Sequence, residues 1–93
     1  MIIKKKVQQK YFQAVEDGRK PFEIRLADFK SKPGDTLVLE EQDINKKLTG
    51  KKIECEVLYK FNIKDIEKFY TKEDLEKYGL VILAIRKKYK YHK

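Results

Sequence analysis

Residues 18–25, GRKPFEIR, bring together three kinds of charged group that can bind or activate a ligand. Glu23 can accept a hydrogen bond from the exocyclic amine of a base, and Lys20 or Arg25 can hold a phosphate or carbonyl oxygen. Arg19 shares the odd numbering of Glu23 and Arg25, so an extended chain would project all three to one side. These residues would then line a ligand-binding cleft. The same charges also suit a surface ion pair that contributes about 0 to 1 kcal/mol, and the spacing alone favours this second interpretation.

A short strand over residues 22–25 would position these groups. Phe22 and Ile24 alternate with the two charged residues, which is typical of a half-buried strand, so we expect both apolar side chains in the core. Lys20 precedes Pro21, which restricts the lysine to extended backbone conformations. It would therefore lie at the entrance to the strand, where it can lean over the end of a barrel.

Several other kinds of site are excluded because their side chains are missing. His92 is the only histidine, so the chain can form neither a His-based catalytic triad nor a zinc site of His and Cys ligands. The glycines stand at least 16 positions apart, which excludes a Gly-rich phosphate loop. Cys55, the only cysteine, shares the apolar side of its predicted strand with Ile53 and Val57, so we expect a core thiol. We expect no metal and no cofactor.

The N-terminal half of the chain predicts a helix and then a strand. Apolar residues at spacings of three and four indicate a helix over residues 7–17, with Tyr11 on its core-facing stripe. Gly18 suits the left-handed position that ends a helix. The Pro-Gly pair in residues 31–35 predicts a turn, and residues 36–41, TLVLEE, predict a strand after it.

The C-terminal half continues this pattern. We expect a turn at residues 48–52 and a strand over residues 53–61, whose apolar and polar residues alternate. Residues 64–78 predict two short helical turns, with Thr71 as an N-cap. Residues 80–85, LVILAI, are apolar on both sides and predict a central strand.

The order of these elements favours an α+β fold with a small mixed or antiparallel barrel of about five strands. The strands follow each other too closely for a set of parallel crossovers. No repeat or linker divides the chain, so we expect one domain over residues 1–87, followed by a basic tail at 88–93.

The net charge of +8 is unevenly distributed along the 93 residues. Residues 1–39 carry nine basic and five acidic side chains, whereas residues 40–85 carry nine and ten, and residues 86–93 add five positive charges. A basic surface attracts nucleic acid without regard to its sequence. Lysines also keep a small protein soluble, and charge alone supports both interpretations equally.

The location of the protein is expected from features that the sequence lacks. The start, MIIKKKVQQK, contains no hydrophobic stretch of a signal peptide, and no run approaches the roughly 18 apolar residues of a membrane helix. A single cysteine suits a reducing compartment. We therefore expect a soluble cytoplasmic protein with no membrane partner, and a monomer in the simplest case.

The segment GRKPFEIR resembles the G-x-K-x-x-E-x-R signature of the ASCH domain family, which belongs to the PUA-like superfamily of small β-barrels. The fixed positions of that signature are occupied here by Gly18, Lys20, Glu23 and Arg25. The segments YFQAVEDG, KPGDTLVLEE, LTGKKIECEVLYKF and YGLVILAI follow the order of small stand-alone members, so the resemblance covers roughly residues 4–87. It implies a PUA-like barrel with flanking helices and a pocket for RNA or a nucleotide-like ligand.

Some members of the family are enzymes. One branch is an amidohydrolase that removes the acetyl group of acetylcytidine with the signature lysine, a threonine and a later glutamate. Lys20 matches that lysine, but Glu23 stands at the threonine position, and three residues compete for the later glutamate: Glu67, Glu73 and Glu76. Other members have been proposed as ribonucleases, for which Glu23 could act as the base.

The resemblance and the charge together predict an RNA-binding domain. Lys20, Glu23 and Arg25 would form the pocket, and Arg19 with the basic ends of the chain would follow the phosphate backbone. Tyr78 is a candidate for stacking on bases; Tyr11 is another, although core packing is favoured for it. The alternatives are a hydrolase that uses Lys20 and Glu23 as catalytic residues, and a protein-interaction module built on the acidic segment 64–76.

Overall fold

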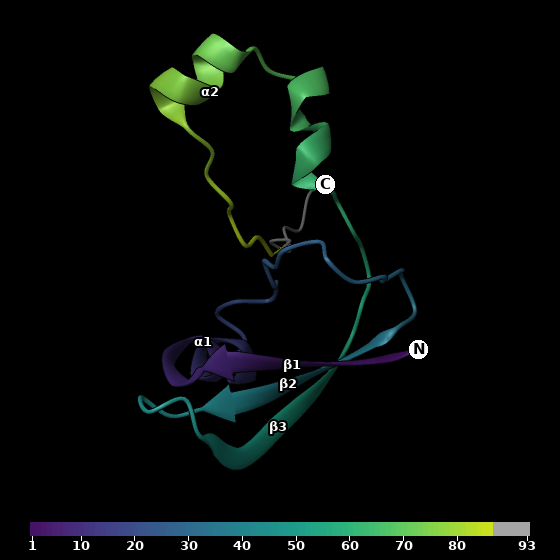
Figure 1. Cartoon of the computed structure of the whole chain (residues 1–93), viewed down its shortest axis with the longest axis vertical. Helices are drawn as coiled ribbons and strands as arrows, with labels where there is room; N and C mark the ends of the chain where they lie inside the picture. Colours follow the sequence, from purple (N-terminus) through teal and green to yellow (C-terminus); the bar gives the residue numbers. More distant parts are fainter. Residues whose placement is uncertain (87–93) are drawn as a thin grey trace, which may run out of the picture.

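A computed structural model describes residues 1–86, and the basic tail predicted at 88–93 lies outside them. The elements are β1 (Ile2–Gln8), α1 (Gln9–Glu16), β2 (Thr36–Gln42), β3 (Leu48–Glu56), the 3₁₀-helix η1 (Ile63–Lys68) and α2 (Lys72–Tyr78). The three strands form one sheet with β2 in the middle, parallel to β1 and antiparallel to β3 (Figure 1). The chain is therefore a small α+β fold built on a mixed open sheet.

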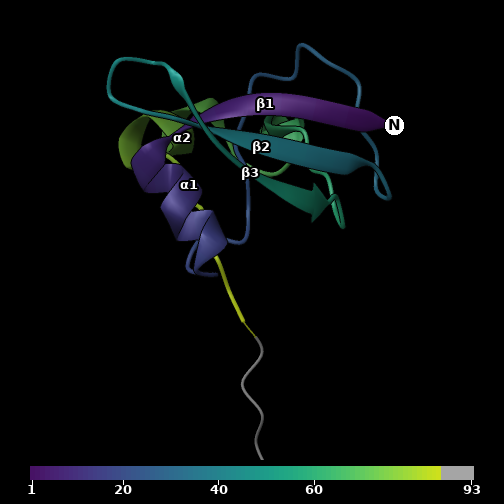
Figure 2. The ribbon, with the colours of Figure 1, turned by 90° about the horizontal axis from the view of Figure 1, so that it is seen from below.

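The core lies between α1 and one face of the sheet (Figures 1 and 2). Its buried residues are Val7, Phe12 and Leu39, and partly buried side chains that include Ile53 and Cys55 pack against them. We call the face of the sheet that carries these side chains the inner face. Full burial of one such apolar side chain contributes about 1.5 to 3 kcal/mol, so this small cluster anchors the helix to the sheet.

The predicted helix begins later than the sequence pattern suggested, because a strand precedes it. Ile3 and Val7 are buried and alternate with exposed neighbours along β1. Lys5 shares their side of the strand, and its ammonium lies 4.0 Å from the centre of the Phe29 ring. This cation–π contact lets a lysine stand among apolar positions. The run of three lysines therefore conceals the alternation of a strand.

The helix contacts the sheet through a stripe that differs only in part from the one predicted. Phe12 is fully buried, and Val15, three positions further on, packs against the same cluster. Tyr11 was expected on this stripe, but it is 43% exposed, because the side of the helix that meets the sheet is the one that carries Phe12 and Val15. Gly18 follows the helix with a φ of 79°, as its predicted role in ending the helix requires.

The turn predicted at residues 31–35 is confirmed, and its last residue is a buried carboxylate. Asp35 is 1% exposed, and its two oxygens accept from the side chain and backbone of Lys32, at 2.8 and 2.9 Å. The amino group of Met1 also lies 3.2 Å from Asp35 Oδ1. The pKa of Asp35 is lowered to about 2, and the main cause is the hydrogen bond from the Lys32 side chain.

The strand predicted over 36–41 is confirmed as β2, but the following turn lies earlier than predicted. Residues 48–52 belong to β3, and the turn is closed by the Asp43 carboxylate, which accepts from the backbone N–H groups of Asn45 and Lys47 at 2.8 and 3.0 Å. Gly50 has a φ of 94° and lies where the register between β2 and β3 shifts. This glycine marks a bulge inside a strand and not a turn.

The remaining elements agree with the sequence only in part. The predicted alternation holds for residues 53–56, but β3 ends at Glu56 and not at residue 61. Both short helices predicted over 64–78 are present, and Thr71 caps α2 by accepting from the backbone N–H of Asp74 at 3.1 Å. Each helix within residues 1–86 is too short and too polar to span a lipid bilayer.

Residues 80–85 do not form the central strand that was predicted. They are irregular and exposed, with Ile82 at 47% and Ile85 at 85%. After β3 the chain runs away from the sheet into η1 and α2, at the opposite end of the molecule in Figure 1, and residues 80–85 return from there. The segment does not enter the hydrogen-bonded sheet, which ends at β1 on one side and β3 on the other.

Candidate functional site

The site begins where the chain leaves α1. The backbone N–H of Gly18 donates to the Val15 carbonyl at 3.1 Å, and that of Lys20 donates to the Ala14 carbonyl at 2.9 Å. The positive φ of Gly18 allows this reversal, which a residue with a Cβ adopts only with strain. The lysine of the motif is therefore fixed by its backbone beside the last turn of the helix.

Glu23 joins the charged residues of the motif into one cluster. Its Oε1 accepts from Lys20 Nζ at 3.0 Å and its Oε2 accepts from Arg25 Nε at 2.6 Å. The side chains are 14% exposed for Glu23, 18% for Lys20 and 29% for Arg25. Each oxygen of the carboxylate thus has a cationic partner. Among the expected site residues, these three are brought together.

Arg25 connects this cluster to the sheet, since its guanidinium also donates to the backbone carbonyl of Lys6 in β1. The segment 22–25 is therefore held by side-chain contacts and is irregular, where a strand was predicted. Without a ladder of backbone hydrogen bonds, its alternation does not produce two faces. Phe22 is partly buried, but Ile24 is 53% exposed. The prediction that Ile24 lies in the core is therefore wrong.

The ammonium of Lys20 lies between polar and aromatic neighbours. It donates to the Phe22 carbonyl at 2.8 Å in addition to Glu23, which accounts for two of its three N–H donors. It also lies 4.7 Å from the centre of the Phe22 ring and 5.9 Å from that of Tyr11. Within residues 1–86, the third N–H of this partly buried cation has no hydrogen-bond acceptor.

An open pocket of about 540 Å³ lies between α1 and residues 19–22. We call it the α1 pocket, and its lining residues are Lys10, Tyr11, Gln13, Ala14, Arg19, Lys20 and Phe22. Arg19 donates through Nε to both oxygens of Asp17, at 2.9 and 3.0 Å, and its terminal nitrogens make no hydrogen bond within residues 1–86. Of the predicted site residues, Arg19 and Lys20 line the pocket, whereas Glu23 and Arg25 do not.

The comparison with known proteins yields one family. The sequence pattern of a family described as "Domain of unknown function (DUF3850)" matches residues 2–85. The chain belongs to this family. The match spans β1 to the segment after α2, so the motif and the α1 pocket of this DUF3850 domain both lie inside it. No curated protein matches the chain.

Cys55 of the DUF3850 domain lies on the inner face and packs against the core cluster, as expected for a core thiol. Burial raises the pKa of the Cys55 thiol, and the negative charge of Glu23 raises it further. The contacts of the motif cluster place it next to the end of α1 and against β1, through the backbone of Lys20 and the guanidinium of Arg25.

The sequence interpretation missed a second buried carboxylate of the domain. Glu41 is 1% exposed, and its Oε1 accepts from Thr49 Oγ1 at 2.7 Å. Its Oε2 has no hydrogen-bond partner within the part of the chain that the structure describes. The signal was present in β2, because Glu41 shares its parity with Leu37 and Leu39 and so falls on the inner face.

Other candidate residues are not brought to the motif. Tyr78 lies on α2, is 73% exposed, and lines a different pocket of about 420 Å³ together with Leu80. Lys10 was not singled out from the sequence, yet it lines the α1 pocket, because its position one turn before Ala14 places both on one side of the helix. Within residues 1–86, no three His, Cys, Asp or Glu side chains lie close enough to hold a metal ion.

Proposed function

We propose that this chain is a small ASCH-type domain that binds RNA or a nucleotide-like ligand at the GRKPFEIR motif. The observation that carries the proposal is the position of Lys20, a half-buried ammonium held by Glu23 at the wall of the α1 pocket. Fixing a cation at such a wall lowers the entropic cost of binding an anionic or carbonyl-bearing ligand. Glu23 and Arg25 act as positioning residues behind it.

The charges around the pocket support a ligand that carries phosphate. Lys10, Arg19 and Lys20 line the pocket, and no carboxylate among the described residues does so. Because the Arg19 side chain is 68% exposed and keeps its terminal nitrogens available, it can contact a phosphate oxygen as the backbone passes. The basic N-terminal part of the chain would extend this contact along the strand of RNA.

We further propose that the full fold is a small PUA-like barrel in a cytoplasmic protein. The outer strands β1 and β3 each keep one edge without a partner in the described sheet. Arg25 already reaches the Lys6 carbonyl on the edge of β1, and residues 80–85 present apolar side chains that a barrel would bury. A single cysteine with a free thiol supports a reducing compartment.

A hydrolase with Lys20 and Glu23 as catalytic residues is the alternative, for which acetylcytidine or RNA would be the substrate. Its weakness lies at Glu23, because both carboxylate oxygens already accept from cations and the residue does not line the pocket. A general base needs an oxygen within reach of the proton that it removes. Incubation of acetylcytidine and of short RNA with wild type and with Lys20→Ala tests this alternative, and product formed only by the wild type would establish it.

Titration of a fluorescent single-stranded RNA pool at several salt concentrations tests the binding proposal. Contact with about five phosphates predicts a slope near −3.5 when log affinity is plotted against log salt. Arg19→Gln should reduce the magnitude of that slope by about 0.7, the value of one phosphate contact. Lys52→Gln, on β3, removes an equal charge away from the pocket and should leave the slope closer to that of the wild type.

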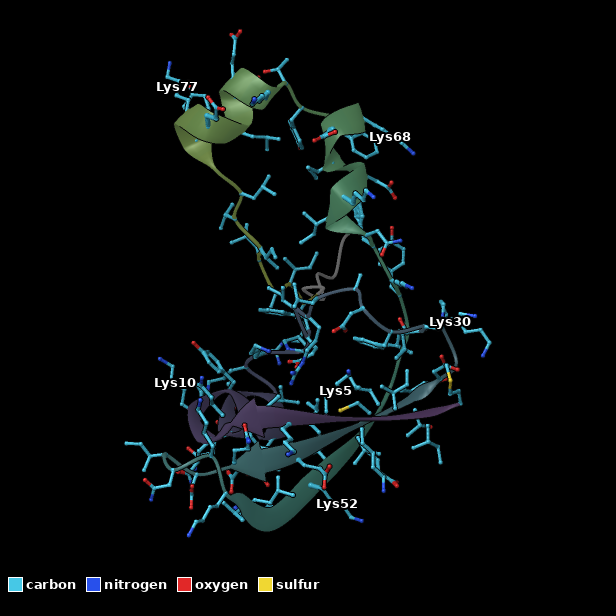
Figure 3. The ribbon with its side chains drawn as sticks, viewed as in Figure 1. Lys5, Lys10, Lys30, Lys52, Lys68 and Lys77 are labelled. Atoms are coloured by element: carbon cyan, nitrogen blue, oxygen red, sulfur yellow. The ribbon has the colours of Figure 1, made fainter. Side chains whose placement is uncertain are left out.

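The control separates a site from general attraction. Figure 3 shows Lys10, which lines the pocket, beside α1, and Lys52 on β3, so Lys52 lies away from the pocket. If the two substitutions, Arg19→Gln and Lys52→Gln, lower the slope equally, binding is not localised at the pocket. If the wild type shows no salt-dependent binding to any RNA, the proposal fails.

A further inference from the structure

Two aromatic rings give the α1 pocket a chemical character that its charge alone does not define. Tyr11 is 43% exposed, because Phe12 occupies the core position next to it, and Phe22 is only partly buried. Both rings lie within 6 Å of the Lys20 ammonium, so they border the same space. Exposed rings beside a cation are the arrangement on which unpaired bases stack.

The cations lie where the phosphate of a stacked nucleotide could reach them. Lys10 directly precedes Tyr11 in α1, and its ammonium lies 5.2 Å from the centre of the Tyr11 ring. Arg19 also lines the pocket, and of its guanidinium nitrogens only Nε donates to Asp17 within residues 1–86. A ligand with a planar ring at the aromatic side chains therefore has positive charge near its edges.

The free donor of Lys20 adds a preference among bases. Its ammonium can only donate, since it has no acceptor. Guanine, uracil and cytosine each carry a carbonyl oxygen that could accept this N–H, whereas adenine has none. The ammonium lies over the Phe22 ring, at 4.7 Å from its centre, and farther from the centre of the Tyr11 ring, at 5.9 Å. A base stacked on Tyr11 would therefore lie beside the ammonium and meet this donor at its edge.

We propose that the α1 pocket takes one unpaired nucleotide of an RNA strand, that Tyr11 stacks on its base, and that Lys20 selects a base with a carbonyl oxygen. Lys10 and Arg19 hold the adjoining phosphate. The volume of about 540 Å³ falls within the range of small-ligand sites. A base in a duplex is covered by its neighbours and cannot enter, so the ligand is single-stranded. This inference rests on the RNA binding proposed above and assigns the pocket its ligand.

The stacking role is tested by two substitutions of one residue, measured with fluorescent oligo(U). Tyr11→Phe keeps the ring, so its affinity should stay within about twofold of the wild type. Tyr11→Leu keeps an apolar side chain on an exposed helix position but removes the ring. Because base stacking on an aromatic side chain is lost, its affinity should fall by at least about fivefold. Equal affinity of both variants would overturn the proposal.

The base preference is tested by comparing oligo(U) with oligo(A) of equal length on wild type and on Lys20→Met. The wild type should bind oligo(U) about tenfold more tightly, since oligo(A) leaves a charged donor without its acceptor. In Lys20→Met the ratio of the affinity for oligo(U) to that for oligo(A) should fall to nearly one. Self-stacking of oligo(A) affects wild type and variant equally, so the comparison between the two proteins removes its effect. A urea midpoint of Lys20→Met confirms that the variant is folded.

The outcomes distinguish this inference from the proposed function. Salt-dependent RNA binding with no loss in Tyr11→Leu and no base preference would overturn the nucleotide pocket while leaving RNA binding intact. A base preference that persists in Lys20→Met would overturn the role of Lys20. Absence of binding to every oligomer would overturn both proposals.

Discussion

The motif cluster makes a quantitative prediction about stability. Glu23→Gln removes the negative charge between Lys20 at 3.0 Å and Arg25 at 2.6 Å. The amide oxygen can still accept from one cation, but the amide nitrogen then faces the other. Breaking an exposed ion pair costs about 0 to 1 kcal/mol and breaking a buried one about 3 to 5 kcal/mol. Because these side chains are 14% to 29% exposed, we expect the free energy of unfolding to fall by about 2 kcal/mol.

Urea unfolding followed by circular dichroism measures this loss. For a chain of this size, the free energy of unfolding falls by roughly 1 to 1.5 kcal/mol per molar urea, so the midpoint should drop by about 1.3 to 2 M. Asp17→Asn is the matched control, since it breaks the pair with Arg19, whose side chains are 51% and 68% exposed. That change should stay below about 0.5 kcal/mol. A midpoint for Glu23→Gln no lower than that of Asp17→Asn would refute the assignment of Glu23 as the residue that holds the cluster.

Three further predictions concern buried titratable groups. Asp35 has a pKa of about 2 in the folded chain, below its usual value, so its stabilising effect should be complete above about pH 4 and be lost as the pH falls toward 2; the difference in urea midpoint between wild type and Asp35→Asn should shrink over that range, and a constant difference would contradict it. Thr49→Val removes the one hydrogen bond that the Glu41 carboxylate makes within residues 1–86 and should cost about 1 to 3 kcal/mol in thermal or urea unfolding, whereas the same substitution in a Glu41→Leu background should cost much less. Burial raises the pKa of Cys55, so alkylation by iodoacetamide in the folded chain should increase with pH later than for an unfolded control, and coincident profiles would argue against it.

The charged motif could be predicted from the sequence because its spacing is short. Glu23 lies within three residues of both Lys20 and Arg25, so any bent or extended backbone brings the three charges near one another. The site's other half could not be predicted in this way. Tyr11 carries the same apolar signal as Phe12, and only the side on which α1 meets the sheet decides which ring is buried and which one faces the pocket.

Strand boundaries were harder to predict wherever charged residues stand in a strand. Lys5 takes an inner-face position by contacting the Phe29 ring, and Glu41 takes another by bonding to Thr49, so hydropathy alone misses both. Residues 80–85 show the opposite case, in which a strongly apolar pattern is not matched by a place in the sheet. A hydropathy pattern indicates which side chains of a segment would be buried in a strand. Whether they are buried depends on contacts with segments that lie far away in the sequence.

The parallel pairing of β1 with β2 has a consequence for the order of events during synthesis. Ile2 pairs with Thr36, so the first strand must wait until the second has been made, while β2 and β3 can pair as a local hairpin soon after both exist. The bond from Arg25 to the Lys6 carbonyl needs β1 in its final place. A newly made chain can therefore pair β2 with β3 before β1 joins the sheet, and the bond that fastens the motif cluster to β1 forms only after that.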